Sequence, residues 1–156
     1  MPQGITSLAP RGANITSNHL RGIFMSESKL RDLSMDFSVQ IIDLVKELKA
    51  KHETIISHQI GRSGTSIGAN IHEANYAQGK KDFVSKLEIA LKEASETGYW
   101  LELLYRTHYI DVARFQSLNA QCASIRVMLI ASCKTAKENM NKEQNQIRES
   151  ESDGEN

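Results

Sequence analysis

Apolar residues recur at intervals of three and four along four segments of the chain, the spacing that places side chains on one face of an α-helix. The first segment ends at about Lys51, the second runs from about Ile55 to Ala74, the third ends near Thr107, and the fourth begins at Asp111. Short connections separate these segments. The pattern predicts an all-α fold, an up-down-up-down antiparallel four-helix bundle with disordered N- and C-terminal tails.

The same pattern divides the chain into three parts. Residues 1–28 contain both prolines and no apolar periodicity, so we expect a disordered extension. Basic residues with no acid before Glu27 also match a transit peptide, an interpretation we favour less, and Met25 is an alternative to Met1 as the natural start. Residues 29–138 are expected to form the bundle. Residues 139–156 are expected to form a polar, acidic tail, because the apolar rhythm fades there.

A row of polar residues lies beside the apolar row of the second helix. Its members, at helical spacing, are Gln59, Arg62, Ser66, Asn70 and Glu73. An antiparallel third helix, joined by a turn near Gln78, would bring Arg62 close to Glu93 and Glu96. It would also place Asn70 opposite Lys86. We favour a structural role, in which Arg62 pairs with one of these glutamates and the other polar residues fix the helix register, over a ligand-binding or subunit-contact face.

Two stretches are apolar around most of the helix circumference. They lie late in the third helix and in the middle of the fourth, and they include Trp100, Leu103, Val127, Met128 and Ile130. A helix that is apolar all round is buried on more than one side. We therefore expect these five residues to lie in the interface of a homo-oligomer.

The balance of charge argues against strong attraction to polyanions. The chain has 19 basic and 19 acidic side chains and no net charge. No run of about eighteen apolar residues exists, so we expect no membrane-spanning helix. Cys122 and Cys133 lie on one predicted helix, about 16 Å apart along its axis, too far for a disulfide. Free thiols predict a reducing, cytoplasmic location.

Some basic residues should nevertheless gather at one end of the bundle, among acidic neighbours. Those that we regard as candidate RNA contacts are Lys49, Lys51, Arg106 and Arg114. A cyclic oligomer would repeat any small positive excess around its axis. We favour a solvated rim of mixed charge.

Motifs for catalysis, cofactors and metals are not found. The segment 61–68 has several glycines but neither order of a phosphate-binding loop, and no strand precedes it. Gly61, Gly64 and Gly68 recur at helical spacing, which we attribute to the close approach of a neighbouring helix. No histidine has the Glu-x-x-His spacing of di-iron bundles. We therefore predict no catalytic residue, no cofactor and no metal.

Five short motifs occur in a fixed order between positions 59 and 101. They are Gln59-Ile60-x-Arg62, Ser66-Ile67-x-x-Asn70-Ile71-x-Glu73, Lys81-Asp82-Phe83, Ile89-Ala90-Leu91-Lys92-Glu93-Ala94-x-Glu96-Thr97 and Tyr99-Trp100-Leu101. Together they resemble the bacterial four-helix bundle family, also called the ribosomal RNA intervening-sequence protein family. A related branch is the accessory variability determinant of diversity-generating retroelements, a basic pentamer that works with a reverse transcriptase and RNA.

The resemblance implies the bundle fold, a homopentamer and a link to RNA, and it implies no catalytic activity. The chain departs from the family pattern at Ala74, where many members carry Gly, and in its balanced charge. We therefore predict a non-enzymatic oligomeric scaffold or adaptor with a homo-oligomeric partner and no membrane partner. The alternative is an RNA-binding accessory factor for a nucleic-acid enzyme such as a reverse transcriptase.

Overall fold

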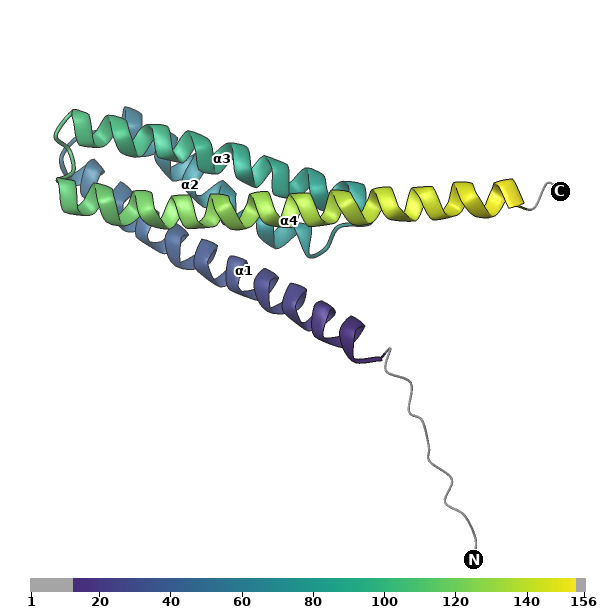
Figure 1. Cartoon of the computed structure of the whole chain (residues 1–156). Coiled ribbons are helices and arrows are strands. Elements are labelled where there is room, and N and C mark those ends of the chain that lie inside the picture. Colours follow the sequence, from purple (N-terminus) through teal and green to yellow (C-terminus); the bar gives the residue numbers. More distant parts are fainter. Residues whose placement is uncertain (1–12, 154–156) are drawn as a thin grey trace, which may run out of the picture.

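A computed structural model describes residues 13–153 of the chain, and all regular structure in this range is α-helical. The helices are α1 (Ala13–Ala50), α2 (Ile55–Ala74), α3 (Lys80–Arg106) and α4 (Val112–Asp153). Successive helices run antiparallel (Figure 1). The α1–α2 and α3–α4 connections share one end of the bundle, and the α2–α3 turn lies at the other. The predicted all-α, up-down-up-down bundle is confirmed.

The core forms where the four predicted apolar rows meet. Its largest fully buried apolar side chains are Phe37, Ile41, Leu44, Leu48, Ile60, Ile67, Leu101, Leu104, Leu118, Ile125 and Leu129. Each helix contributes to this set. Burial of each Leu, Ile or Phe stabilises the fold by roughly 1.5–3 kcal/mol relative to an exposed position.

Glycines on α2 permit α1 to approach closely. A Cβ atom added at Gly64 would lie 2.9 Å from side-chain carbons of Ile41, and one added at Gly61 would lie 3.2 Å from Val45. Any larger residue at position 64 would push the two helices apart. The predicted close approach of a neighbouring helix is thus confirmed, and that helix is α1.

The two connections at the shared end each place a histidine in the left-handed backbone conformation. His52 and His108, which follow α1 and α3, have φ angles of 62° and 63°. After His52, the backbone N–H of Glu53 donates to the carbonyl of Leu48 at 2.9 Å, as in a Schellman motif. For residues with a Cβ atom, the left-handed conformation costs roughly 1–2 kcal/mol. It ends each helix sharply, so both turns reverse the chain within a few residues.

Glu53 also starts α2. Its buried carboxylate accepts hydrogen bonds from the backbone N–H groups of Ile55 (3.0 Å), Ile56 (2.8 Å) and Ser57 (2.6 Å). These are donors that have no partner within the helix. A negative charge at this end also complements the helix dipole. Sequence reasoning missed this cap, because it expected Glu53 only as part of a mixed-charge rim.

The helices extend beyond the predicted limits of the bundle. Residues 13–28, which were expected to be part of a disordered extension, belong to α1, and residues 139–153 belong to α4. No proline follows Pro10, so the backbone can form helical hydrogen bonds there without a packed apolar face. Residues 1–12 and 154–156 lie outside the described residues, and the prediction for them stays a prediction. Among the described residues, no helix is both long and apolar enough to cross a bilayer.

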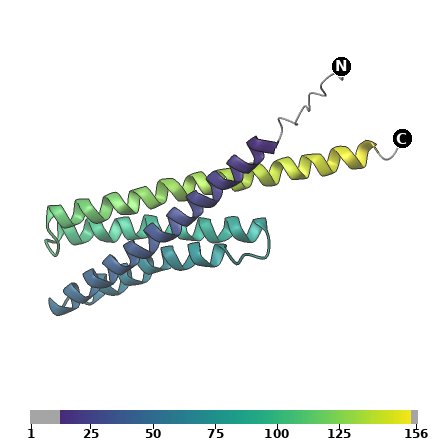
Figure 2. The same ribbon diagram turned by 90° about the horizontal axis from the view of Figure 1, so that it is seen from below.

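α1 is the helix that departs from a compact bundle. It crosses the other helices at an angle (Figure 2), and its N-terminal half diverges from α4 (Figure 1). α1 consequently packs less extensively against α4 than against α2. The seam between α1 and α4 is the open side of the molecule.

Candidate functional site

The predicted ion pair between α2 and α3 is present. Arg62 Nη1 lies 3.3 Å from Glu93 Oε1, and Arg62 Nη2 donates to Glu96 Oε1. The exposed fractions of the three side chains are 46% for Arg62, 19% for Glu93 and 34% for Glu96. The cluster is therefore half-exposed at the edge of the α2–α3 seam. Its pairing supports the structural interpretation of the polar row.

The chemistry of Glu96 is set by two donors. Arg62 and the indole Nε1 of Trp100 (3.1 Å) both donate to Glu96, and these bonds, that of Arg62 first, hold the pKa of its carboxyl below the ordinary value of 4.5. The hydrogen bond to Glu96 and the charge of Glu93 raise the pKa of Arg62. A carboxylate with a lowered pKa is a weak base at neutral pH. The cluster therefore suits a structural role better than proton transfer.

A buried hydroxyl pair lies next to this cluster. The Oγ atoms of Ser63 and Thr97 are 2.9 Å apart, and both residues are fully buried. Sequence reasoning missed the pair because each hydroxyl sits inside an apolar row, Ser63 between Ile60 and Ile67. A polar residue at a core position of each helix was the available signal. Buried hydroxyls need partners, so the pair ties α2 to α3 at one register.

The helix register differs from the prediction by about one turn. Lys86 Nζ lies 2.6 Å from Glu73 Oε2, whereas the prediction placed Lys86 opposite Asn70. The prediction was wrong because it centred the antiparallel pair near Gln78, whereas the contact between the short side chains of Ser63 and Thr97 centres it near Lys80. The hydrogen bond to Glu73 and its charge raise the pKa of Lys86. Arg62 and Glu73 of the polar row are thus both paired to α3.

The middle of the polar row bonds within α2. Ser66 Oγ donates to the carbonyl of Arg62 at 2.7 Å, and Asn70 Nδ2 donates to the carbonyl of Ser66 at 2.9 Å. Gln59 is half-buried and makes no side-chain hydrogen bond with the described residues. Bonds to the preceding turn of the same helix cannot fix register between helices. That task falls to Arg62, Glu73 and the buried hydroxyls.

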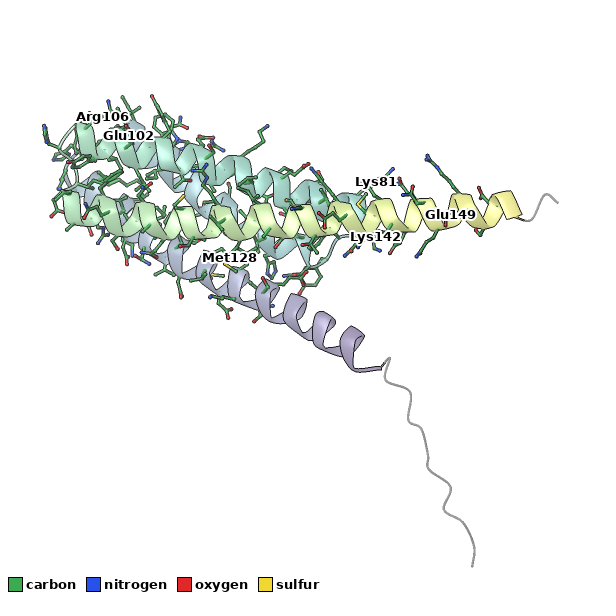
Figure 3. The ribbon with its side chains drawn as sticks, in the orientation of Figure 1. Lys81, Glu102, Arg106, Met128, Lys142 and Glu149 are labelled. Atoms are coloured by element: carbon green, nitrogen blue, oxygen red, sulfur yellow. The ribbon has the colours of Figure 1, made fainter. Side chains whose placement is uncertain are left out.

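The four candidate RNA contacts share one end of the bundle, but most are engaged. They are Lys49, Lys51, Arg106 and Arg114. Arg106 Nη2 lies 2.5 Å from Glu102 Oε1, and both residues are seen near this end in Figure 3. Arg114 pairs with Glu47 at 3.3 Å, and Lys51 Nζ donates to a backbone carbonyl of the α3–α4 connection at 3.0 Å. The surface is a rim of mixed charge.

The predicted oligomer interface divides into exposed and half-buried residues. Val127 is 67% exposed and Ile130 is 52% exposed on the outer face of α4. Trp100, Leu103 and Met128 are half-buried and pack against the core of their own subunit. Ala123 is exposed at helical spacing from Val127. We call Ala123, Val127 and Ile130 the α4 stripe.

A second exposed apolar row lies on the outer face of α1. Met35 is 61% exposed, Val39 55% and Ile42 43%, and their spacing of four and three aligns them along the helix. Sequence reasoning missed this row, which we call the α1 stripe, because the stronger core row that includes Phe37 and Ile41 accompanies it. An exposed apolar row of this kind indicates an interaction surface.

Besides the Arg114–Glu47 ion pair at the end of the bundle, an amide pair bridges the open seam between α1 and α4. Gln40 Nε2 donates to Gln121 Oε1 at 2.7 Å, and Gln121 Nε2 donates back to Gln40 Oε1 at 3.0 Å. Beyond this bridge, towards the diverging end, a groove of about 610 Å³ runs between the helices and is lined by Leu33 and Val127, among others. Met128, which also lines it, lies between α4 and α1 in Figure 3.

The comparisons with known proteins agree with this fold. The chain matches the family model described as 23S rRNA-intervening sequence protein over residues 26–131. The chain belongs to this family. Four chains among the solved structures match it. One is similar to it at 49% sequence identity, with a TM-score of 0.69, and the match covers 70% of this chain and 98% of that one. It is described as a protein of unknown function from the S23 ribosomal protein family of Bacteroides thetaiotaomicron. No curated protein matches the chain.

In this member of the 23S rRNA-intervening sequence protein family, the cysteines are buried and free. Burial raises the pKa of the Cys122 thiol to about 11, and its Sγ lies 3.2 Å from the carbonyl oxygen of Ala94. Burial also raises the pKa of Cys133. Thiols that stay protonated are poor nucleophiles. Within residues 13–153, no group of three or more His, Cys, Asp or Glu side chains is placed to hold a metal ion.

Proposed function

We propose that this protein is a non-enzymatic helical scaffold or adaptor that works as a homo-oligomer. The observation that carries the proposal is the apolar surface left outside the core, namely the α1 stripe and the α4 stripe. Val39 and Val127 each expose more than half of their surface in the single chain. Contiguous exposed apolar rows are disfavoured in a monomer and common where proteins associate.

The polar groups support the same proposal. Arg62, Glu93 and Glu96 are engaged with one another, and Ser63 and Thr97 with each other, so these groups are occupied in holding α2 against α3. The resemblance stated above favours five subunits. The two protonated thiols suit a reducing compartment, and we infer a cytoplasmic location.

Light scattering coupled to size-exclusion chromatography tests the proposal. At micromolar concentration we expect one species with a mass several times that of the 17.5 kDa subunit. Circular dichroism on the same sample confirms that the helices are formed. A folded species at the mass of one subunit would contradict the proposal.

The second candidate function is RNA binding at the end that carries Lys49, Lys51, Arg106 and Arg114. A ring would bring several copies of this end together, which favours contact with phosphates. The ion pairs of Arg106 and Arg114 weaken the argument, because their charges are already compensated. We therefore place this function after the scaffold.

A salt titration of RNA binding distinguishes the two candidates. For the scaffold we expect little affinity at about 0.15 M salt, with any binding at lower salt falling steeply as salt is added. Lys49→Glu combined with Arg106→Glu should abolish this residual binding. Lys92→Glu combined with Lys142→Glu, which makes the same charge change elsewhere, should leave most of it. Tight binding that resists salt and depends on Lys49 and Arg106 would establish the RNA function instead.

A further inference from the structure

The two exposed stripes have opposite charges around them. From Asp32 to Val45, the surroundings of the α1 stripe, α1 carries Asp32, Asp36 and Asp43 and no basic residue. From residue 115 to residue 134, the surroundings of the α4 stripe, α4 carries Arg126 and Lys134 and no acidic residue. Along its own helix, each stripe therefore combines an apolar centre with charges of one sign, and the two signs are complementary. Glu88 of α3 and Glu138 also lie beside Ile130, at one end of the α4 stripe.

Asp43 is paired with Lys46 at 3.1 Å, but the other border charges are available to a partner. Among the described residues, Asp36 and Arg126 make no ion pair, although both are exposed. Asp32 lies only within 3.9 Å of Arg31, and Lys134 only within 4.0 Å of Glu138. Such long, exposed pairs contribute little. The charges of these four side chains are therefore largely uncompensated within the subunit.

The two stripes also overlap in part along the bundle. Gln40 and Gln121 contact each other, so they mark one level of two antiparallel helices. Five residues back along α1 is Met35, and five residues forward along α4 is Arg126, so Arg126 lies near the level of Asp36. In a ring whose axis follows the helices, subunits are related by rotation, and residues at the same level face one another.

From these observations we infer that the α1 stripe of one subunit docks against the α4 stripe of the next copy of the chain. The inference rests on the proposed oligomer and specifies its interface. Because the two surfaces are different, the contact is head-to-tail, and an open chain of subunits has one unused stripe at each end until a ring closes. The apolar residues supply the buried area, and the Asp and basic borders fix the orientation.

Two single substitutions and their mixture test the contact. Val39→Glu places a charge in the α1 stripe, and Val127→Glu places one in the α4 stripe. We expect each variant to run as a folded monomer at low micromolar concentration. Mixed in equal amounts, they retain one intact stripe of each kind between them. The mixture should therefore form a dimer, at twice 17.5 kDa, and nothing larger.

Ile147→Glu is the matched control, since Ile147 is 57% exposed on α4 but lies outside both stripes. It should keep the mass of the unmodified protein. If both stripe variants also keep that mass, the interface lies elsewhere and the inference fails, while the oligomer stands. If only one variant dissociates, or if the mixture stays monomeric, the two stripes do not meet. A monomeric unmodified protein would overturn both the inference and the proposed function.

A charge exchange tests the borders separately. Asp36→Arg and Arg126→Asp should each raise the concentration at which the oligomer dissociates by about tenfold, more at low salt than at high salt. Combined in one chain, they should recover most of the loss, because the pair is restored with its signs exchanged. Additive losses in the combined variant would show that these two side chains do not face each other.

Discussion

The seams that α2 makes with α1 and α3 differ from the seam between α1 and α4. Along α2, glycines admit the side chains of α1, and buried hydroxyls and ion pairs join α3. Between α1 and α4, the Gln40–Gln121 amide pair and the exposed Arg114–Glu47 ion pair bridge helices that diverge (Figure 1). The difference shows that one half of the bundle is completed within the subunit. The other half leaves a groove between α1 and α4, and the outer faces of these two helices carry the two apolar stripes that a partner can use.

The largest expected effect is at the α1–α2 seam. Gly64→Val should lower the free energy of unfolding by about 3 kcal/mol, because even its Cβ atom would lie 2.9 Å from Ile41 and the two methyl groups need further space. Gly98→Val is the control, since no atom lies within 4 Å of a Cβ added there, and it should be nearly neutral. Urea denaturation measures both. Equal losses of unfolding free energy in the two variants would mean that helix propensity, and not close packing, sets the cost of Gly64→Val.

The buried hydroxyl pair should come next. Thr97→Val should lower the free energy of unfolding by about 1–2 kcal/mol, because the Ser63 hydroxyl loses its partner away from water. The combined variant Ser63→Ala and Thr97→Val should recover most of this loss, since no unpaired group remains. A double-mutant cycle in urea measures the coupling. Strict additivity would contradict the role assigned to the pair.

The ion cluster should matter less and should depend on pH. The lowered pKa of Glu96 means that its stabilising contribution is complete above the ordinary Glu pKa of 4.5. The contribution is lost as the pH falls through the lowered pKa. Arg62→Gln should destabilise the protein less than Thr97→Val at pH 7, because Arg62 is half-exposed. The melting temperatures of the unmodified protein and the Arg62→Gln variant, measured from pH 7 to pH 3, should converge at the acidic end. A constant difference across this range would exclude the Arg62–Glu96 pair as the cause.

The smallest effect is expected at the α1–α4 seam. Gln40→Ala should lower the free energy of unfolding by about 0.5 kcal/mol or less, because Gln121 is half-buried and can bond to water instead. Urea denaturation under the conditions used for Thr97→Val allows a direct comparison. A loss as large as that of Thr97→Val would show that the open seam is held as firmly as the closed one.

The spacing of apolar residues was sufficient to predict the helices. The polar row, together with an antiparallel third helix after a short turn, was sufficient to predict the Arg62 pair. The register was predicted less well. A turn of a few residues can shift one helix by a full turn without changing either apolar row, and only contacts such as that of Glu73 with Lys86 decide it. The early start of α1 carries no apolar signal either, since a helix can continue on its backbone bonds alone.

The exposed surfaces were the hardest to predict. A sequence shows that α4 is apolar over a wide arc, but it does not show which part of the arc the subunit buries. Met128 and Val127 are consecutive and both line the groove beside α1, but Met128 packs against the core whereas Val127 is 67% exposed. The α1 stripe was hidden for the same reason, because its period coincides with that of the core row. Only the placement of neighbouring helices separates the two rows.

α4 continues past the α2–α3 turn, where Lys80 pairs with Glu143 at its base. Residues 141–151 are exposed throughout, and at 1.5 Å per residue they add about 15 Å of helix. Lys142 and Glu149 lie on this projection, at the end opposite to Arg106 (Figure 3). Rotation about one axis would carry every copy of it to the same side. A cyclic assembly would then be a directional object, with tight turns on one face and a polar collar of parallel helices on the other.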